Sequence, residues 1–159
     1  MKHPFHSGFR PAAAWRGLPG ALACAAVLAL PPAVAAADEV MMYKDPNCGC
    51  CGKWAEHMRA GGFAVKEIAT PGMGEVKRTA GVPQALGSCH TAKVGGYVIE
   101  GHVPAADVKR LLAEKPAIAG IAAPGMPQGS PGMEGPFPAD RYEVVGFDRE
   151  GRSTVFARH

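Results

Sequence analysis

Three cysteines fall within four consecutive residues of this chain, and this cluster constrains the fold and chemistry more than any other feature. The cluster spans residues 48–51 and follows an apolar run at 40–43 that predicts a strand. Trp54 and Met58 lie four residues apart just beyond it, which predicts a helix over 51–60. A position at the start of a helix favours the thiolate form of cysteine. Thiolate is both a nucleophile and a ligand for soft metals.

The remaining sequence predicts short strands and helices in one domain. Alternating apolar and polar residues at 63–68 predict a second strand. The segment 116–139 holds six prolines and five glycines, which predicts a loop without regular structure. Further elements are expected as a short helix at 75–80, a hairpin of 91–94 and 97–100, a helix after Pro104, and a C-terminal hairpin of 142–147 and 153–156. The order β-α-β, short helix, β-β-α predicts an α/β sandwich.

The first 37 residues predict a secretory signal peptide. Basic residues precede an alanine-rich apolar run at 18–30, and small residues at 33–37 offer cleavage sites after Ala35 or Ala37. An uncleaved anchor is the alternative, but residues 18–37 contain three prolines and are barely long enough to span a membrane. Removing Lys2, Arg10 and Arg16 leaves equal numbers of acidic and basic residues. We therefore expect no nucleic-acid partner, and no membrane association of a mature domain at 38–159.

The four cysteines beyond residue 37 allow three interpretations. Disulfide crosslinking alone fits poorly, because Cys50 and Cys51 are adjacent and only Cys89 comes from elsewhere. A thiol-disulfide oxidoreductase would use Cys48 and Cys51 as a C-x-x-C pair before a helix. A metal site would use all four sulfurs, and thiolates this close suit several Cu(I) ions better than one tetrahedral zinc ion. We favour copper, with the oxidoreductase and a structural zinc module as alternatives.

Candidate ligands also occur outside the cluster. Cys89 is expected to reach it, because the segment before the third strand of such a sandwich lies beside the first helix. His90 is either a further ligand or an exposed loop residue. Met126 and Met133 lie in the proline- and glycine-rich loop, where they either bind Cu(I) through sulfur or pack on apolar surface. His102 precedes the last predicted helix and is interpreted as structural.

The sequence resembles the CopG-type periplasmic proteins found with bacterial copper-resistance systems. Three segments in the same order carry this resemblance, at 43–54 (YKDPNCGCCGKW), 88–104 (SCHTAKVGGYVIEGHVP) and 123–135 (APGMPQGSPGMEG). The similarity extends from about Val40 to His159. It implies a thioredoxin-like fold, a periplasmic location and a copper–thiolate site formed by Cys48, Cys50, Cys51 and Cys89.

Together, these features predict a periplasmic copper-binding protein of copper resistance or homeostasis. It would hold Cu(I) in a cysteine-thiolate site, and the thiolate loop leaves open a change of copper oxidation state. Copper ions are the expected ligand, with other periplasmic copper-resistance proteins as candidate partners. The same cysteines would also allow a copper-dependent or thiol oxidoreductase activity.

Overall fold

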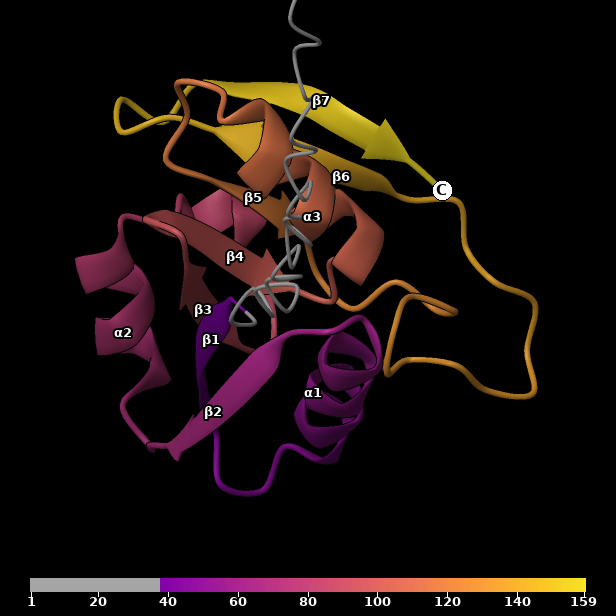
Figure 1. The fold of residues 1–159 in the computed structure, drawn as a ribbon. Helices are drawn as coiled ribbons and strands as arrows, with labels where there is room; N and C mark the ends of the chain where they lie inside the picture. Colours follow the sequence, from indigo (N-terminus) through magenta and orange to yellow (C-terminus); the bar gives the residue numbers. More distant parts are fainter. Residues whose placement is uncertain (1–37) are drawn as a thin grey trace, which may run out of the picture. The chain divides into compact units, whose positions relative to one another are not determined.

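The computed structural model describes residues 38–159, and the predicted signal peptide at 1–37 lies outside the described residues. Within 38–159, seven strands form one mixed sheet in the order β2-β1-β3-β4-β5-β6-β7 (Figure 1). The strands are β1 (Glu39–Lys44), β2 (Ala64–Ala69), β3 (Thr91–Val94), β4 (Tyr97–Gly101), β5 (Gly120–Ala123), β6 (Glu143–Phe147) and β7 (Ser153–Arg158). The helices are α1 (Gly49–Ala60), α2 (Met73–Ala80) and α3 (Ala105–Glu114), with a short 3-10 helix at Gln84–Leu86. The mixed α/β class predicted from the sequence is confirmed.

The β1-α1-β2 unit determines where the cysteine cluster lies. β1 and β2 pair in parallel, so α1 is the crossover that connects them. Helix α1 begins at Gly49, slightly earlier than predicted. Cys48 occupies the position before the helix, and its side chain makes no capping hydrogen bond. All three clustered cysteines therefore lie at the N-terminal end of α1.

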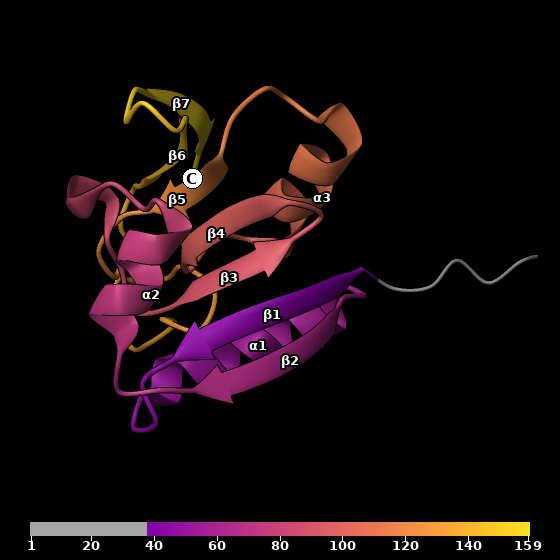
Figure 2. The same cartoon turned by 90° about the vertical axis from the view of Figure 1, so that its left-hand side faces the viewer.

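The helices cover both faces of the sheet. Trp54 and Met58 of α1 are fully buried together with Val108 and Leu111 of α3, so these two helices share one hydrophobic core. Figure 2 shows α1 lying behind β1 and β2, with α2 on the near side of the sheet. Successive residues of a strand point to opposite faces. Residues 98 and 100 of β4 therefore point to the α2 face, and Ile99 points to the face of α1 and α3.

Both predicted hairpins are confirmed. β3 and β4 pair antiparallel from Thr91↔Glu100 to Val94↔Tyr97, and β6 and β7 pair antiparallel from Glu143↔Arg158 to Phe147↔Ser153. The β6-β7 hairpin extends the sheet beyond β5, so the C-terminal part of the chain continues the same sheet.

The prediction that residues 116–139 form only a loop is wrong at residues 120–123. Strand β5 lies parallel to β4 and antiparallel to β6, and all of its residues are buried. Its sequence is Gly-Ile-Ala-Ala, so its small side chains between flanking prolines do not give the alternation that identifies most strands. A Cβ atom at Gly120 would overlap the carbonyl oxygen of Val98, which explains why glycine occupies this crowded position.

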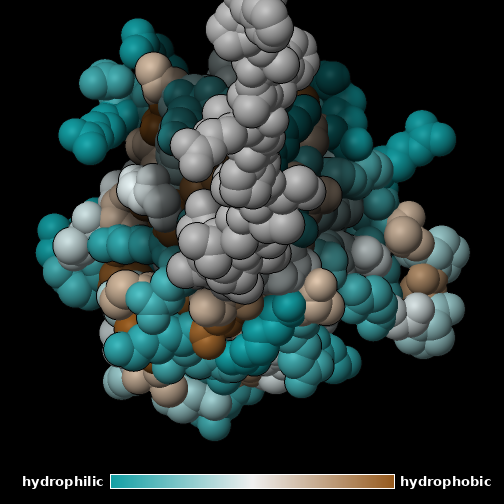
Figure 3. Space-filling model, viewed as in Figure 1, coloured by the Kyte–Doolittle hydropathy of each residue, from teal (hydrophilic) through white to brown (hydrophobic). Residues whose placement is uncertain are grey.

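The face of the domain in Figure 3 is mostly hydrophilic, with small hydrophobic areas scattered over it. Among the described residues, no helix is long and apolar enough to cross a membrane.

Candidate metal centre

The structure brings together all four cysteines that the sequence singled out. Cys48, Cys50 and Cys51 come from the N-terminal end of α1, and Cys89 comes from the segment just before β3. Their four sulfur atoms lie within 4.8 Å of one another. Strand β3 pairs antiparallel with β1, so the start of β3 lies beside the end of β1. Cys89, just before β3, is thereby brought close to the start of α1. The expected approach of Cys89 to the cluster is therefore present.

Two of the four sulfurs are joined in a disulfide. Cys48 and Cys51 form this bond across a Cα–Cα distance of 5.5 Å, whereas Cys50 and Cys89 are free thiols. The Cys50 sulfur lies 3.5 Å from that of Cys48 and 3.8 Å from that of Cys89. The sequence led us to expect thiolates throughout the cluster. In this form Cys48 and Cys51 are not thiolates, because a disulfide sulfur carries no ionisable proton. The bonded pair is the C-x-x-C pair of the oxidoreductase interpretation.

The free thiol of Cys89 lies in surroundings that favour its protonated form. Burial raises the pKa of Cys89 to about 11, and the hydrogen bond and charge of Cys50 act in the same direction. The positive charge of Lys77 opposes this rise. Cys89 therefore carries its proton at neutral pH, and a metal ion that binds its sulfur must displace that proton.

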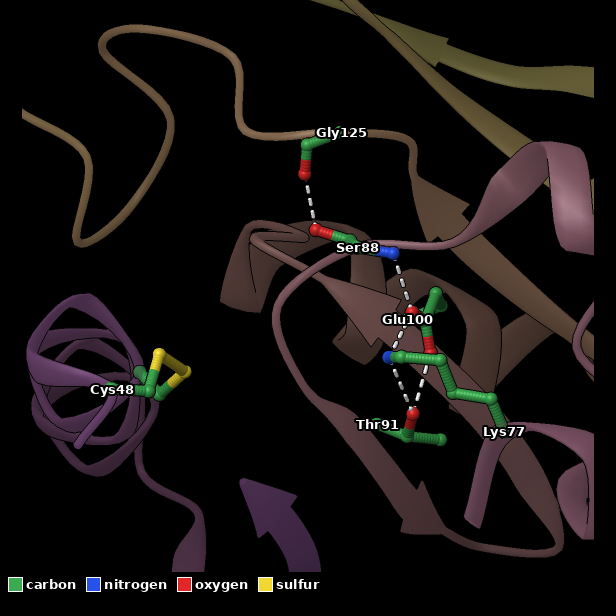
Figure 4. A network of polar contacts seen from close by, with 7 residues as sticks. Cys48, Lys77, Ser88, Thr91, Glu100 and Gly125 are labelled. Carbon is green, nitrogen blue, oxygen red and sulfur yellow. Dashed lines mark hydrogen bonds and ion pairs between the residues drawn. A yellow bond between two sulfur atoms is a disulfide. The ribbon is translucent and has the colours of Figure 1, made fainter. Parts of the chain in front are cut away.

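A buried polar network holds the segment that carries Cys89. The backbone N–H of Ser88 donates to the Glu100 carboxylate at 2.7 Å, and the Thr91 hydroxyl donates to the same group at 2.7 Å. The Ser88 hydroxyl donates to the carbonyl oxygen of Gly125 (Figure 4). Residues on both sides of Cys89 are thus attached to Glu100 on β4, and Ser88 also connects the segment to the long loop after β5.

Glu100 is fully buried, and its charge is balanced by Lys77 of α2. The Lys77 ammonium lies 2.5 Å from the carboxylate. Burial raises the pKa of Glu100, while Lys77, Thr91 and the Ser88 amide lower it. A buried carboxylate without such partners strongly destabilises a fold. The pair therefore fixes α2 and β4 together next to the Cys89 segment.

The loop after β5 crosses the start of α1 at Gly132. This residue has a φ of +84°, which favours glycine, and a Cβ atom there would lie 2.8 Å from both the Cys50 carbonyl oxygen and the Trp54 backbone nitrogen. The neighbouring Pro131 carbonyl oxygen accepts a 2.8 Å hydrogen bond from the ring of His102. The loop is therefore packed against the first turn of α1, which carries Cys50.

The two loop methionines occupy different positions. Met126 is 57% exposed and lines, together with Cys89, a pocket of about 330 Å³. Met133 follows Gly132 and is half-buried. The structure therefore brings Met126 close to one cysteine of the cluster, and Met133 is not among the residues that line this pocket.

His90 is buried, so its interpretation as an exposed loop residue is wrong. Its ring lies 4.4 Å from the Trp54 ring and 5.0 Å from the His102 ring, measured between centroids. Burial lowers the pKa of both histidines, that of His90 strongly, so both rings are neutral. By distance and angle, neither ring nitrogen of His90 makes a hydrogen bond, although the Gly101 backbone acts to raise its pKa against the effect of burial.

Sequence reasoning missed two residues that shape the site, namely Lys77 and Glu100. Glu100 had a usable signal, because it is a charged residue inside the otherwise apolar strand segment 97–101. Its partner Lys77 lies 23 positions earlier, at a spacing that no local pattern reveals. The interpretation of His102 as structural agrees with its buried ring, which lies beside His90 and is hydrogen-bonded to the loop at Pro131.

The fold and the sulfur cluster define a cysteine-rich α/β domain with a group of side chains that could hold a metal ion. A family model described as "Protein of unknown function, DUF411" matches residues 86–133. No curated protein matches the chain.

Two solved structures show which family the chain belongs to. The structure named copper resistance protein CopG, form 2, is 44% identical, covers 78% of this chain and 99% of its own, and has a TM-score of 0.75. Form 1 is 45% identical, covers 76% of this chain and 96% of its own, and has a TM-score of 0.72. The chain belongs to the CopG family of copper resistance proteins, which confirms the resemblance seen in the sequence.

Proposed function

We propose that this protein is a periplasmic copper-binding protein of copper resistance that holds Cu(I) between Cys48, Cys50, Cys51 and Cys89. The observation that carries this proposal is the meeting of four sulfur atoms within 4.8 Å. Two thiolates that share one metal ion at roughly 2.3 Å each cannot lie more than about 4.6 Å apart. The spacing of the sulfurs is therefore compatible with shared metal ions after small side-chain movements.

The choice of copper rests on ligand chemistry and on the relatives. Dense thiolates are soft ligands that suit Cu(I). Both similar solved structures are named as copper resistance proteins. A structural zinc module is less well supported, because a closed zinc site usually draws on separated ligand pairs, whereas three of these cysteines occupy one helix end.

The Cys48–Cys51 disulfide makes copper capacity depend on redox state. In the disulfide form only Cys50 and Cys89 offer thiols, and in the reduced form all four cysteines do. Reduction breaks the S–S bond and requires two electrons and two protons, which a dithiol reductant supplies while it becomes a disulfide itself. The same proposal includes a change of copper oxidation state, in which the Cys48 and Cys51 thiols form the disulfide, release two electrons and two protons, and reduce two Cu(II) ions to Cu(I).

We interpret residues 38–159 as one thioredoxin-like domain that residues 1–37 direct to the periplasm. Support for the fold comes from strands β2-β1-β3-β4, in which β1 and β2 are parallel and β3 is antiparallel to β1. The C-x-x-C pair lies at the start of the helix after β1, where a thioredoxin-like protein requires it.

A thiol-disulfide oxidoreductase is the second candidate function. The disulfide between Cys48 and Cys51 is the specific observation that favours it. This candidate predicts turnover with a dithiol substrate in metal-free protein, and it gives Cys89 no role. The copper proposal uses Cys89, and it assigns Met126 as a thioether ligand at the pocket beside it, with Met133 and His90 as further candidates.

Anaerobic titration with Cu(I) tests the proposal in two forms of the same protein. We expect the reduced protein to bind more copper per chain than the protein whose disulfide is intact, because two further thiolates become available. The matched control is Cys48→Ser/Cys51→Ser, which should bind the same low amount with or without reductant. Equal copper capacity of both wild-type forms would show that Cys48 and Cys51 are not ligands.

A further inference from the structure

Cys89 lies in a short segment that one side chain of β4 holds on both sides. The residue before it, Ser88, donates its backbone N–H to the Glu100 carboxylate at 2.7 Å. Thr91, two residues after Cys89, donates its hydroxyl to the same carboxylate at 2.7 Å. The two bonds reach different oxygen atoms, Oε1 and Oε2. Glu100 therefore fixes the backbone on either side of the cysteine.

The carboxylate is itself held in place by Lys77 of α2. The ammonium group lies 2.5 Å from Oε1 of Glu100 and donates a second hydrogen bond, of 3.1 Å, to the Thr91 hydroxyl. Glu100 is fully buried. Because both of its carboxylate oxygens accept hydrogen bonds, a rotation of Glu100 would break several of these bonds at once.

Fold stability alone does not account for a buried ion pair at this place. Replacing such a pair by well-packed apolar side chains of similar volume is often neutral or stabilising. The same face of β4 carries Val98, which belongs to an apolar cluster with Ala122 and Phe147. What the carboxylate of Glu100 adds is two hydrogen-bond acceptors that meet the Cys89 segment.

The position of Cys89 matters for the cluster, because no helix fixes it relative to the other sulfurs. Its sulfur lies 3.8 Å from that of Cys50, which comes from α1. Ser88 also donates its hydroxyl to the carbonyl oxygen of Gly125, so the residue before Met126 is attached to the same segment. Groups that orient a metal ligand typically contribute a factor of roughly 10–100 to metal affinity.

We propose that Glu100, fixed by Lys77, is a positioning residue that holds Cys89 at the distance from Cys50 that a shared copper ion requires. The other three cysteines need no such residue, because the start of α1 fixes their spacing. This inference rests on the proposed function, since it takes Cys89 to be a copper ligand. It adds a pair of residues that affects copper binding without touching copper.

A double-mutant cycle in Cu(I) affinity tests the proposal. The variant Lys77→Met/Glu100→Leu removes the carboxylate without leaving its charged partner behind. In otherwise wild-type, reduced protein, we expect it to bind Cu(I) roughly 10–100-fold more weakly in competition with a chromophoric chelator. In Cys89→Ser protein the same replacement should cause no further loss, because the ligand that Glu100 positions is already absent.

The matched control is Glu143→Gln, which breaks an exposed ion pair of 3.0 Å with Arg158 and should leave the Cu(I) affinity unchanged. An equal loss from Lys77→Met/Glu100→Leu with and without Cys89 would indicate a general effect on the fold and would overturn the proposal. Wild-type affinity in Lys77→Met/Glu100→Leu would overturn it as well. Wild-type affinity in Cys89→Ser would instead contradict the proposed function itself.

The variant Thr91→Val supplies a second test that does not depend on the folding of the double variant. It removes one of the two attachments of the Cys89 segment and leaves the pair of Lys77 and Glu100 intact. We expect a smaller loss of Cu(I) affinity than in Lys77→Met/Glu100→Leu, present in otherwise wild-type protein and absent in Cys89→Ser. The same loss in both, or no loss in either, would overturn the proposal.

Discussion

The variant Cys89→Ser is expected to lower the copper load of the reduced protein and to weaken the binding of the copper that remains. Cys89 is the one cysteine of the cluster that does not come from the N-terminal end of α1, so it attaches any shared metal ion to the segment before β3. Loss of a group that merely orients a metal ligand costs roughly 10–100-fold in affinity. Loss of a ligand itself should cost at least as much, as measured by competition with a chromophoric Cu(I) chelator.

The control for this variant is Met126→Leu. Met126 shares the pocket with Cys89 but is 57% exposed, so its replacement should reduce copper affinity less than Cys89→Ser and leave the number of bound ions unchanged. Serine is close to cysteine in size, and Cys89 is only partly buried, so the fold should be retained. Full stoichiometry and wild-type affinity in Cys89→Ser would contradict a four-thiolate site.

The variant Gly132→Ala is expected to destabilise the domain by roughly 2–5 kcal/mol. A side chain in the left-handed conformation costs about 1–2 kcal/mol, and forcing atoms into a packed contact costs about 1–3 kcal/mol. At Gly132 both costs apply, because the added Cβ would lie 2.8 Å from backbone atoms of α1. Urea unfolding of the metal-free, disulfide-containing protein measures the loss.

Gly125→Ala is the matched control in the same loop. Gly125 also has a positive φ, of +69°, but a Cβ atom there would meet no atom within 4 Å. We therefore expect Gly125→Ala to lose only about 1–2 kcal/mol, the cost of the backbone conformation alone. Equal losses in the two variants would contradict this prediction, because they would show that the overlap at Gly132 adds no cost.

Much of the fold could be predicted from the sequence, because it follows from local patterns. The spacing of Trp54 and Met58 identified α1, and Gly95-Gly96 identified the β3-β4 hairpin. Strand β5 could not be predicted, because its buried glycine and alanines show no alternation and lie in a segment rich in proline. Its position depends on pairing with β4 and β6, which are distant in sequence.

The sequence could predict which cysteines come together in the candidate site, but it could not predict their oxidation state. The topology of a β-α-β-β unit explains why Cys89 could be expected beside residues 48–51. Spacing alone does not say whether Cys48 and Cys51 are thiolates or a disulfide, because both states use the same pair. The burial of His90 depends on its contacts with Trp54 and His102, and these contacts form only in the folded domain.

The metal content of the protein isolated anaerobically from copper-fed cells tests the central claim most directly. The proposed function predicts more than one copper ion per chain with zinc near zero, and copper bound to sulfur in the X-ray absorption spectrum. Protein that carries little metal and keeps the Cys48–Cys51 disulfide would contradict the claim and support the oxidoreductase instead.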